Sequence, residues 1–415
     1  MNQTGEPDST TRVPGHTPVP RYRAWTGLAV LSQGFRPFFL LAAIWAIVAL
    51  IIWIHAFVGL INLSSRFDPL TWHNHEMLFG YAAAVLAGFL LTAIPNWTGR
   101  LPLQGAPLAV LVLLWIIGRF AVGYSSALPP VATAVLDLSF LVALLLVALR
   151  EIVAGKNWRN LPLLAALLVL IMANGLVHAG QANWIEMDGT DTTLDEYGLR
   201  LALSVFAVMI TLIGGRIVPS FTRNWLAKAK ITQFPTPFAR FDKLALIAGI
   251  IALLSWTLAP EAAVSGILCL IAAILHAVRL SRWQGHRTWR EPLLLVLHLG
   301  YGWIPVSLAL LGATALAPAE FPASVGIHAL TAGAIATMTL AVMVRAIRGH
   351  TGRALTSDVF TTSIFVVITL AALTRLAAPY AGDHYTPCLM ASAALWVLAF
   401  LGFVAVNAKA LLLRR

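Results

Sequence analysis

The sequence predicts an all-α membrane protein, a polytopic bundle of twelve transmembrane helices. Hydrophobic residues make up 59% of its 415 residues and charged residues 11%, whereas about a quarter of an average soluble domain is charged. The mean hydropathy is +0.82. Apolar runs recur along the chain, and each approaches the roughly 20 residues that a helix needs to cross a hydrocarbon core of about 30 Å. This composition excludes an ordinary soluble enzyme and a disordered protein.

Pro, Gly, Asn and charged residues separate the apolar runs and set the predicted ends of the helices. The division of 240–282 into two spans rests on Pro260 and Glu261. Both cysteines, Cys269 and Cys388, lie inside apolar runs, which excludes a disulfide framework and a CxxC metal or redox site. The predicted spans are, in chain order, 36–60, 72–97, 106–124, 129–150, 161–184, 196–219, 240–259, 260–282, 291–316, 321–347, 355–379 and 383–412.

Basic residues fall in alternate breaks, and this sets the predicted orientation because Lys and Arg accumulate in cytoplasmic loops. With a cytoplasmic N-terminus, all but four of the 28 Lys and Arg residues lie in or beside inner segments. The outer loop after the fifth span is acidic and contains Asp188 and Asp191. We therefore expect both termini in the cytoplasm. The net charge of +11 then reflects topology, and no nucleic-acid partner is expected. The four exceptions are Arg66, Arg119, Arg200 and Arg375.

The chain is predicted to have a leader and one membrane domain. Residues 1–30 are expected to be a disordered cytoplasmic leader, because the chain begins with a stretch rich in Pro, Thr and Ser and lacks the apolar core of a signal peptide there. Residues 31–415 form the membrane domain. Within it we predict three tandem four-helix units at about 34–157, 158–287 and 288–415.

Two recurring signatures support these units. Spans 1, 5 and 9 begin with an aromatic residue and an arginine shortly before a proline, which suits a first helical turn. Spans 2, 6 and 10 end in polar segments that contain a threonine and an arginine. The prolines are 125 and 130 residues apart and the threonines 124 and 129, so the two signatures keep nearly the same spacing. The residues are Pro37, Pro162, Pro292, Thr98, Thr222 and Thr351.

Histidines supply the candidate chemistry, because ionisable side chains at membrane depth are costly and usually functional. His75 and His328 each lie 23 residues before the signature threonine, and the middle unit has Leu199 at that offset. His178 lies near the outer end of span 5. Imidazole binds copper and supplies axial ligands to haem iron. We therefore expect His75, His178 and His328 to meet at one outer metal site.

Neighbouring polar residues are expected to support that site. His73 is a further metal-ligand candidate, and it shares a helix face with Glu76 by their spacing, whereas His75 points elsewhere. Asn174 and Gln181 lie on the stripe of His178 and would orient it. The alternatives are histidines that face water and a hydrogen-bonded cluster that binds nothing.

A second group lies near the inner side. His276 and His298 are expected to face one another across a short basic loop and to bind a metal together, with Tyr301 near them. A hydrogen bond from a histidine to Tyr301 is the alternative. His350 is a further ligand candidate in a loop.

Asp137 is a lone carboxylate within span 4. Two readings fit it equally well: a proton carrier, or the partner of Arg119 or of a helix end.

Long segments of the chain resemble the NnrS family. The resemblance runs from about residue 30 to the C-terminus and implies a bacterial inner-membrane protein that contains haem b and copper. It also implies a link to nitric oxide, denitrification and protection against nitrosative stress, without assigning a reaction. The segments that carry the resemblance are GFRPFFLLAAIW (34–45), WHNHEMLFGYAAAVLAGFLLTAIPNWTGR (72–100), GGRIVPSFTRNW (214–225), PLLLVLHLGYGWIP (292–305) and HALTAGAIATMTLAVMVRAIRGHTGR (328–353).

Three functions remain open at this point. The first is a metalloprotein that binds nitric oxide or a nitrosyl species at haem or copper and reduces, sequesters or relays it, with an unidentified electron donor. The second is a transporter whose units move against each other and whose histidines bind substrate or protons. The third is a membrane scaffold for partner enzymes. Histidines near both membrane faces favour the first.

Overall fold

The computed structural model describes residues 25–185 and 192–413, and in them twelve helical segments are long and apolar enough to cross a membrane. Most of the predicted leader and the acidic residues Asp188 and Asp191 lie outside these ranges. The predicted count is confirmed, and the protein is a multi-pass membrane protein. The helices are α1 (Phe35–Phe57), α2 (Pro69–His75), α3 (Ala83–Thr98), α4 (Ala106–Gly123), α5 (Pro130–Ala154), α6 (Leu161–Gln181), α7 (Leu194–Met209), α8 (Gly215–Lys228), α9 (Arg240–Leu258), α10 (Ala263–Ser281), α11 (Pro292–Leu316), α12 (Ala323–His328), α13 (Ala336–His350), α14 (Val359–Ala377) and α15 (Tyr385–Leu412).

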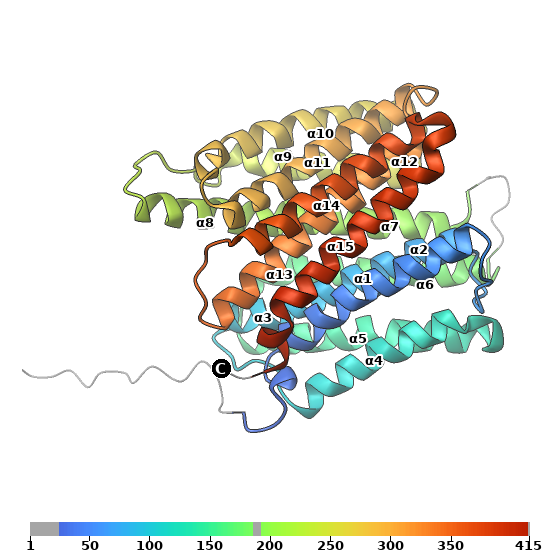
Figure 1. Ribbon diagram of the computed structural model, residues 1–415, viewed down its shortest axis with the longest axis horizontal. Helices are drawn as coiled ribbons and strands as arrows, with labels where there is room; N and C mark the ends of the chain where they lie inside the picture. The colour runs from blue at the N-terminus through green and yellow to red at the C-terminus, as the bar shows by residue number, and fades with distance from the viewer. Residues whose placement is uncertain (1–24, 186–191, 414–415) are drawn as a thin grey trace, which may run out of the picture.

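One predicted boundary is wrong. The sixth span does not end at residue 219 but continues to Lys228, because Pro219 lies inside α8 and the helix extends beyond the apolar run as a polar segment. Figure 1 shows α8 projecting from one end of the bundle, the end at which the chain also terminates.

Spans 2, 6 and 10 share an unusual feature, because each contains a π-helical segment between two α-helices. These segments are η2 (Glu76–Ala82), η5 (Ile210–Gly214) and η7 (Ala329–Ile335). π-Helical turns often mark functional sites. η2 directly follows His75 and η7 directly follows His328, so these two histidines occupy equivalent positions in their helices. This agrees with the predicted tandem repeat, which stays a prediction.

The three π-containing spans are buried in the centre of the bundle, and apolar helices surround them. A π turn disturbs the regular hydrogen-bond ladder, and a free carbonyl in a membrane must find a donor. The indole Nε1 of Trp115 donates to the Gly80 carbonyl in η2 at 3.0 Å. Arg279 Nη1 donates to the Thr211 carbonyl in η5 at 3.0 Å.

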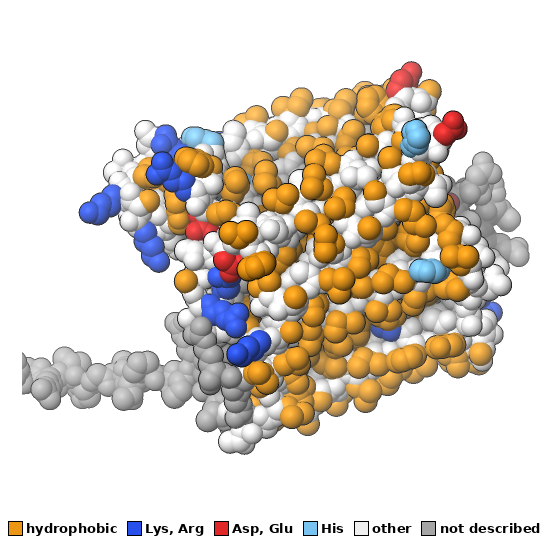
Figure 2. Space-filling view, viewed as in Figure 1, with side chains coloured by type: hydrophobic (Ala, Val, Ile, Leu, Met, Phe, Trp, Pro, Cys, Tyr) orange, Lys and Arg blue, Asp and Glu red, His pale blue; other side chains and the backbone are white. Residues whose placement is uncertain are grey.

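The first and last spans pack against each other and close the bundle. The indole Nε1 of Trp396 in α15 donates to the Ala46 carbonyl in α1 at 3.0 Å. Figure 2 shows hydrophobic side chains covering the long flank of the molecule, while most of the visible Lys and Arg side chains gather at the end from which α8 projects. A membrane-embedded flank with one basic end is the distribution that the positive-inside rule requires.

The orientation can be tested by cysteine accessibility. We expect Lys228→Cys, in the exposed end of α8, to react with a membrane-impermeant maleimide only after the cytoplasmic side is opened. Glu320→Cys, in the exposed turn between α11 and α12, should react in intact spheroplasts. The background lacks the two native cysteines (Cys269→Ala, Cys388→Ser). Labelling of the Lys228 variant in intact spheroplasts would reverse the predicted topology.

Candidate metal centre

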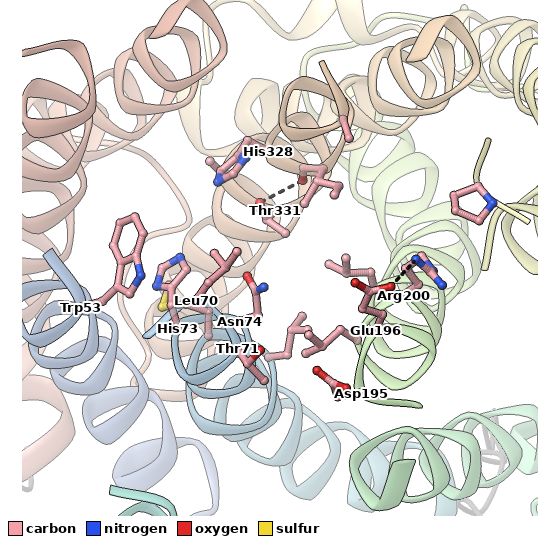
Figure 3. Close-up of a pocket in the computed structure, with 18 of the residues that line it drawn as sticks. Trp53, Leu70, Thr71, His73, Asn74, Asp195, Glu196, Arg200, His328 and Thr331 are labelled. Atoms are coloured by element: carbon pink, nitrogen blue, oxygen red, sulfur yellow. Dashed lines mark hydrogen bonds and ion pairs between the residues drawn. The ribbon is translucent and has the colours of Figure 1, made fainter. Parts of the chain in front are cut away.

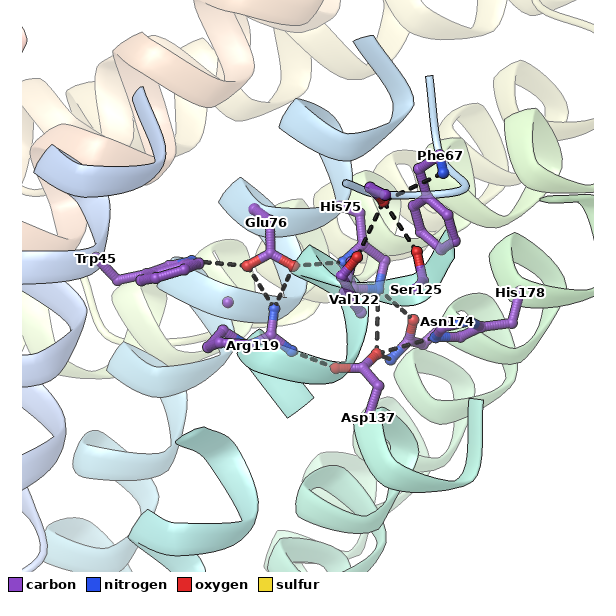
Figure 4. Close-up of polar contacts among 12 residues, drawn as sticks. Trp45, Phe67, His75, Glu76, Arg119, Val122, Ser125, Asp137, Asn174 and His178 are labelled. Carbon is purple, nitrogen blue, oxygen red and sulfur yellow. Dashed lines mark hydrogen bonds and ion pairs between the residues drawn. The ribbon is translucent and has the colours of Figure 1, made fainter. Parts of the chain in front are cut away.

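Six buried polar residues meet in the half of the bundle that lies away from α8. We call them the polar cluster: His75, Glu76, Arg119, Asp137, Asn174 and His178. They come from four consecutive spans, at the junction of α2 and η2 and in α4, α5 and α6 (Figure 4). Their side chains are almost completely buried. Polar groups at this depth must satisfy one another, because the hydrocarbon offers no partners.

The guanidinium of Arg119 lies between the two carboxylates of the cluster. Its Nη1 donates to both oxygens of Glu76 at 2.7 Å, and its Nη2 donates to Asp137 Oδ1. Glu76 Oε2 also accepts from the Trp45 indole at 2.8 Å. Asp137 is therefore the partner of Arg119, which is one of the two readings that the sequence left open.

Both ring nitrogens of His75 face acceptor atoms. Nδ1 lies 3.0 Å from Glu76 Oε1, and Nε2 lies 3.1 Å from Asp137 Oδ2 and 2.9 Å from Asn174 Oδ1. Acceptors on both sides suit an imidazole that carries a proton on each nitrogen. Two carboxylates, one guanidinium and one imidazolium then give a cluster with no net charge. A net charge would raise the free-energy cost of burial in the membrane interior.

His178 completes a group of three potential metal ligands. Its Nε2 lies 3.1 Å from Asp137 Oδ2, and Asn174 Nδ2 donates to the same oxygen at 2.7 Å. One atom each from His75, Asp137 and His178 lie within 4.8 Å of one another, close enough to hold one metal ion. The ring of Phe67 lies 5.3 Å from His75 and 5.5 Å from His178, so an apolar wall borders the group.

Local backbone features allow these side chains to converge. Gly80 leaves room for the Trp45 indole and the Glu76 carboxylate, since a Cβ there would lie 2.5 and 2.9 Å from their atoms. A Cβ at Gly118 would lie 2.9 Å from Asp137 Oδ1. His73 and Glu76 both contact α1, through Trp53 and Trp45, and the Glu76 carboxylate also joins His75 in the cluster.

The predicted meeting of His75, His178 and His328 holds for the first two only. His328 lies instead in the wall of a cavity of about 1280 Å³, together with His73 (Figure 3). Asn174, predicted to orient His178, bonds to His75 and Asp137. Gln181 lies outside the cluster, and its amide donates to Asp195 at 3.0 Å.

The inner histidines have protein partners of their own. Arg279 Nη1 donates to the Tyr301 hydroxyl oxygen at 2.9 Å, so the hydroxyl hydrogen is available to His276 Nδ1 at 2.8 Å. The Thr222 hydroxyl donates to a carbonyl and therefore accepts from His298 Nε2 at 2.8 Å. No hydrogen bond joins His276 to His298 in the described residues. The alternative to metal binding, a hydrogen bond between a histidine and Tyr301, is therefore present at His276.

His350 is the last residue of α13 and not a loop residue. Its ring lies 5.6 Å from the ring of Phe35, and it borders a small pocket of about 90 Å³. His350 lies at the end of its span that carries the signature threonine, away from the polar cluster. It shares no potential ligand group with another histidine within the described ranges.

The chain matches one known protein family over most of its length. The model of one family, described as NnrS protein, matches residues 29–415, which is nearly the whole chain. The predicted resemblance is thereby confirmed. No curated protein sequence matches the chain.

The central role of Arg119 predicts a large loss of stability on its removal. Arg119→Met leaves two buried carboxylates without their shared cation, and breaking a buried ion pair from one side costs about 3–5 kcal/mol. We expect a markedly lower midpoint of thermal unfolding in detergent. Arg66→Met, which removes an exposed arginine in the same half of the protein, is the matched control and should change the midpoint little. Equal midpoints for the two variants would contradict the assigned role.

Proposed function

The chain belongs to the NnrS protein family, and we propose that it is a haem- and copper-containing protein of the bacterial inner membrane that binds nitric oxide or a nitrosyl species. Family membership supports a membrane protein related to nitric oxide. In this proposal the protein protects the cell against nitrosative stress during nitric-oxide metabolism. Both termini lie in the cytoplasm, so the polar cluster lies toward the periplasm.

The group of His75, Asp137 and His178 is the observation that carries the proposal. Copper accepts imidazole ligands, so two imidazoles with a carboxylate would hold it, and a metal held by three protein ligands keeps a position for a small molecule. A copper ion bound there would supply that position to nitric oxide. Asn174 would hold the carboxylate of Asp137 in place through its amide, and Arg119 would hold the other oxygen of the same carboxylate.

Charge balance favours a cuprous ion at this site. A metal ligand must present a lone pair, so His75 would lose a proton from Nε2 on binding. The ion then replaces that proton, and one positive charge replaces another. The cluster stays neutral, which is what its burial requires. A divalent ion would leave one extra positive charge, and an anionic ligand would be needed to offset it.

The residues around the cluster prepare it to take up an uncharged diatomic molecule. Phe67 meets the His75 ring edge-on and Phe79 meets it at a tilt, at 5.3 and 4.9 Å between centroids, and the two rings exclude bulky polar ligands from that side. On that side the apolar wall favours nitric oxide over water, because burial of a polar ligand without partners is costly. His75 and His178 are also the only two described histidines whose rings contact each other, at 5.5 Å.

Copper content tests the proposal. We expect protein purified from copper-supplemented cells to carry about one copper per chain, and His75→Ala, His178→Ala or Asp137→Asn to lower the occupancy to about a tenth or less, since each removes a ligand. His384→Ala changes an exposed histidine and should leave the copper content unchanged. Elemental analysis gives the readout. Full occupancy in a His75→Ala, His178→Ala double variant would exclude this copper site. Colourless, metal-free wild-type protein would favour the transporter instead.

A further inference from the structure

The cavity of about 1280 Å³ is separate from the polar cluster although the two share a wall. Along α2, His73 and Asn74 line the cavity while His75 points into the cluster. We call this space the large cavity. It exceeds the roughly 300–1,000 Å³ of a typical small-molecule site. All three predicted units contribute to its wall, for example through His73, Arg200 and His328 (Figure 3).

Unsatisfied polar atoms are concentrated around the large cavity. Among the described residues, eleven buried side-chain nitrogen or oxygen atoms have no hydrogen-bond partner. Five of these belong to residues of the cavity wall. Buried polar groups are nearly always paired in native proteins, so a cluster of exceptions points to a missing ligand or to water. The five atoms are Trp53 Nε1, His73 Nδ1, Arg200 Nη2, Thr314 Oγ1 and Arg375 Nη1.

His328 has the hydrogen-bond arrangement of a metal ligand. Its Nδ1 lies 2.7 Å from the carbonyl oxygen of Ser324, and a carbonyl can only accept, so Nδ1 carries the proton. Nε2 therefore presents a lone pair, and it makes no hydrogen bond to a described residue. Histidines that bind metals typically donate the other ring N–H to such a carbonyl. The exposed His55 makes the same bond to Ile51, at 2.7 Å, but lies outside the cavity.

His73 presents a second imidazole to the same space. Its ring stacks on Trp53 with 4.1 Å between the ring centroids, and this contact fixes its orientation. Its Nδ1 is buried and has no partner. Figure 3 shows His73 and His328 on one side of the cavity, on helices from the first and the third predicted unit.

Two arginines give the large cavity a preference for anionic groups. Arg375 Nη1 and Arg200 Nη2 have no partner. The wall has four carboxylates: Asp68 caps α2 by accepting from two backbone amides, Asp195 accepts from Gln181, and Glu261 is exposed. Glu196 lies 3.6 Å from Arg200 Nη1, which leaves the Nη2 of that arginine available. The ligand that suits this wall is a largely apolar molecule with two anionic groups and a metal ion that can bind imidazole nitrogen.

We propose that the large cavity is the haem site, with His73 and His328 as the two axial ligands and with Arg200 and Arg375 as partners of the two propionates. The assignment rests on the proposed function, because it takes from it that the chain contains haem. It places haem and copper in adjacent sites, separated by the α2 helix. The inner residues His276 and His298 are not the axial pair of this site, because neither lines the large cavity.

Visible and electron paramagnetic resonance spectra of the full-length protein, purified from membranes, test the assignment. We expect wild-type protein to show the low-spin spectrum of bis-histidine haem. His73→Ala and His328→Ala should each convert it to a high-spin spectrum or empty the site. His55→Ala is the matched control for His328→Ala, and its spectrum should equal that of the wild type.

The arginines have a different expected effect. Arg375→Gln and Arg200→Gln should keep the low-spin spectrum, because the axial ligands remain, and should release haem to an excess of a haem-scavenging protein about tenfold faster, as loss of a charge-assisted hydrogen bond implies. Unchanged spectra in both histidine variants, or loss of the low-spin signal in His276→Ala or His298→Ala alone, would overturn the assignment. Absence of haem and copper from wild-type protein would refute the proposed function itself.

Discussion

The ion pair of Arg119 with Glu76 and Asp137 is the interaction on which the polar cluster depends. A charge at membrane depth is tolerated only when it is compensated on the spot. One guanidinium serves two carboxylates here, and the carboxylates in turn hold His75 and His178. The geometry of the histidines is thus set by a charge requirement, and the four spans that supply the residues are tied together by the same requirement.

The two proposed cofactor sites differ in how completely their buried polar groups are paired. In the polar cluster every group has a partner except one guanidinium nitrogen of Arg119, so a metal would replace protons without changing the net charge. Around the large cavity, donors and lone pairs lack partners, so a ligand would add interactions. α2 serves both sites because neighbouring residues of a helix point in different directions. Nitric oxide would then meet copper and haem in adjacent compartments.

The fold was largely predictable from the sequence, because hydropathy and the distribution of Lys and Arg report directly on the membrane. The spans agree with the structure except where Pro219 continues a helix that apolar runs alone would end. The site was less predictable. The sequence allows Asp137 and Arg119 to be a pair, but nothing in their spacing links them to His75. The π turns were not predicted either, because no local sequence pattern indicates such turns.

Repeat spacing predicted an equivalence, with which the structure agrees, and a contact, which the structure does not contain. His75 and His328 both precede a π-helical segment, yet one lies in the cluster and the other in the cavity wall. Equivalent positions in the predicted units need not meet, because each unit would face the bundle centre from a different direction. The partner of each histidine is decided by the neighbouring unit, which only the three-dimensional arrangement reveals.

X-ray absorption at the copper edge, on copper-loaded wild-type protein, tests the central claim most directly. The account predicts a first shell of nitrogen and oxygen only, with the outer-shell scattering of two imidazoles from His75 and His178 and one carboxylate oxygen from Asp137. A sulfur shell from methionine or cysteine, or scattering from three or more imidazoles, would contradict it.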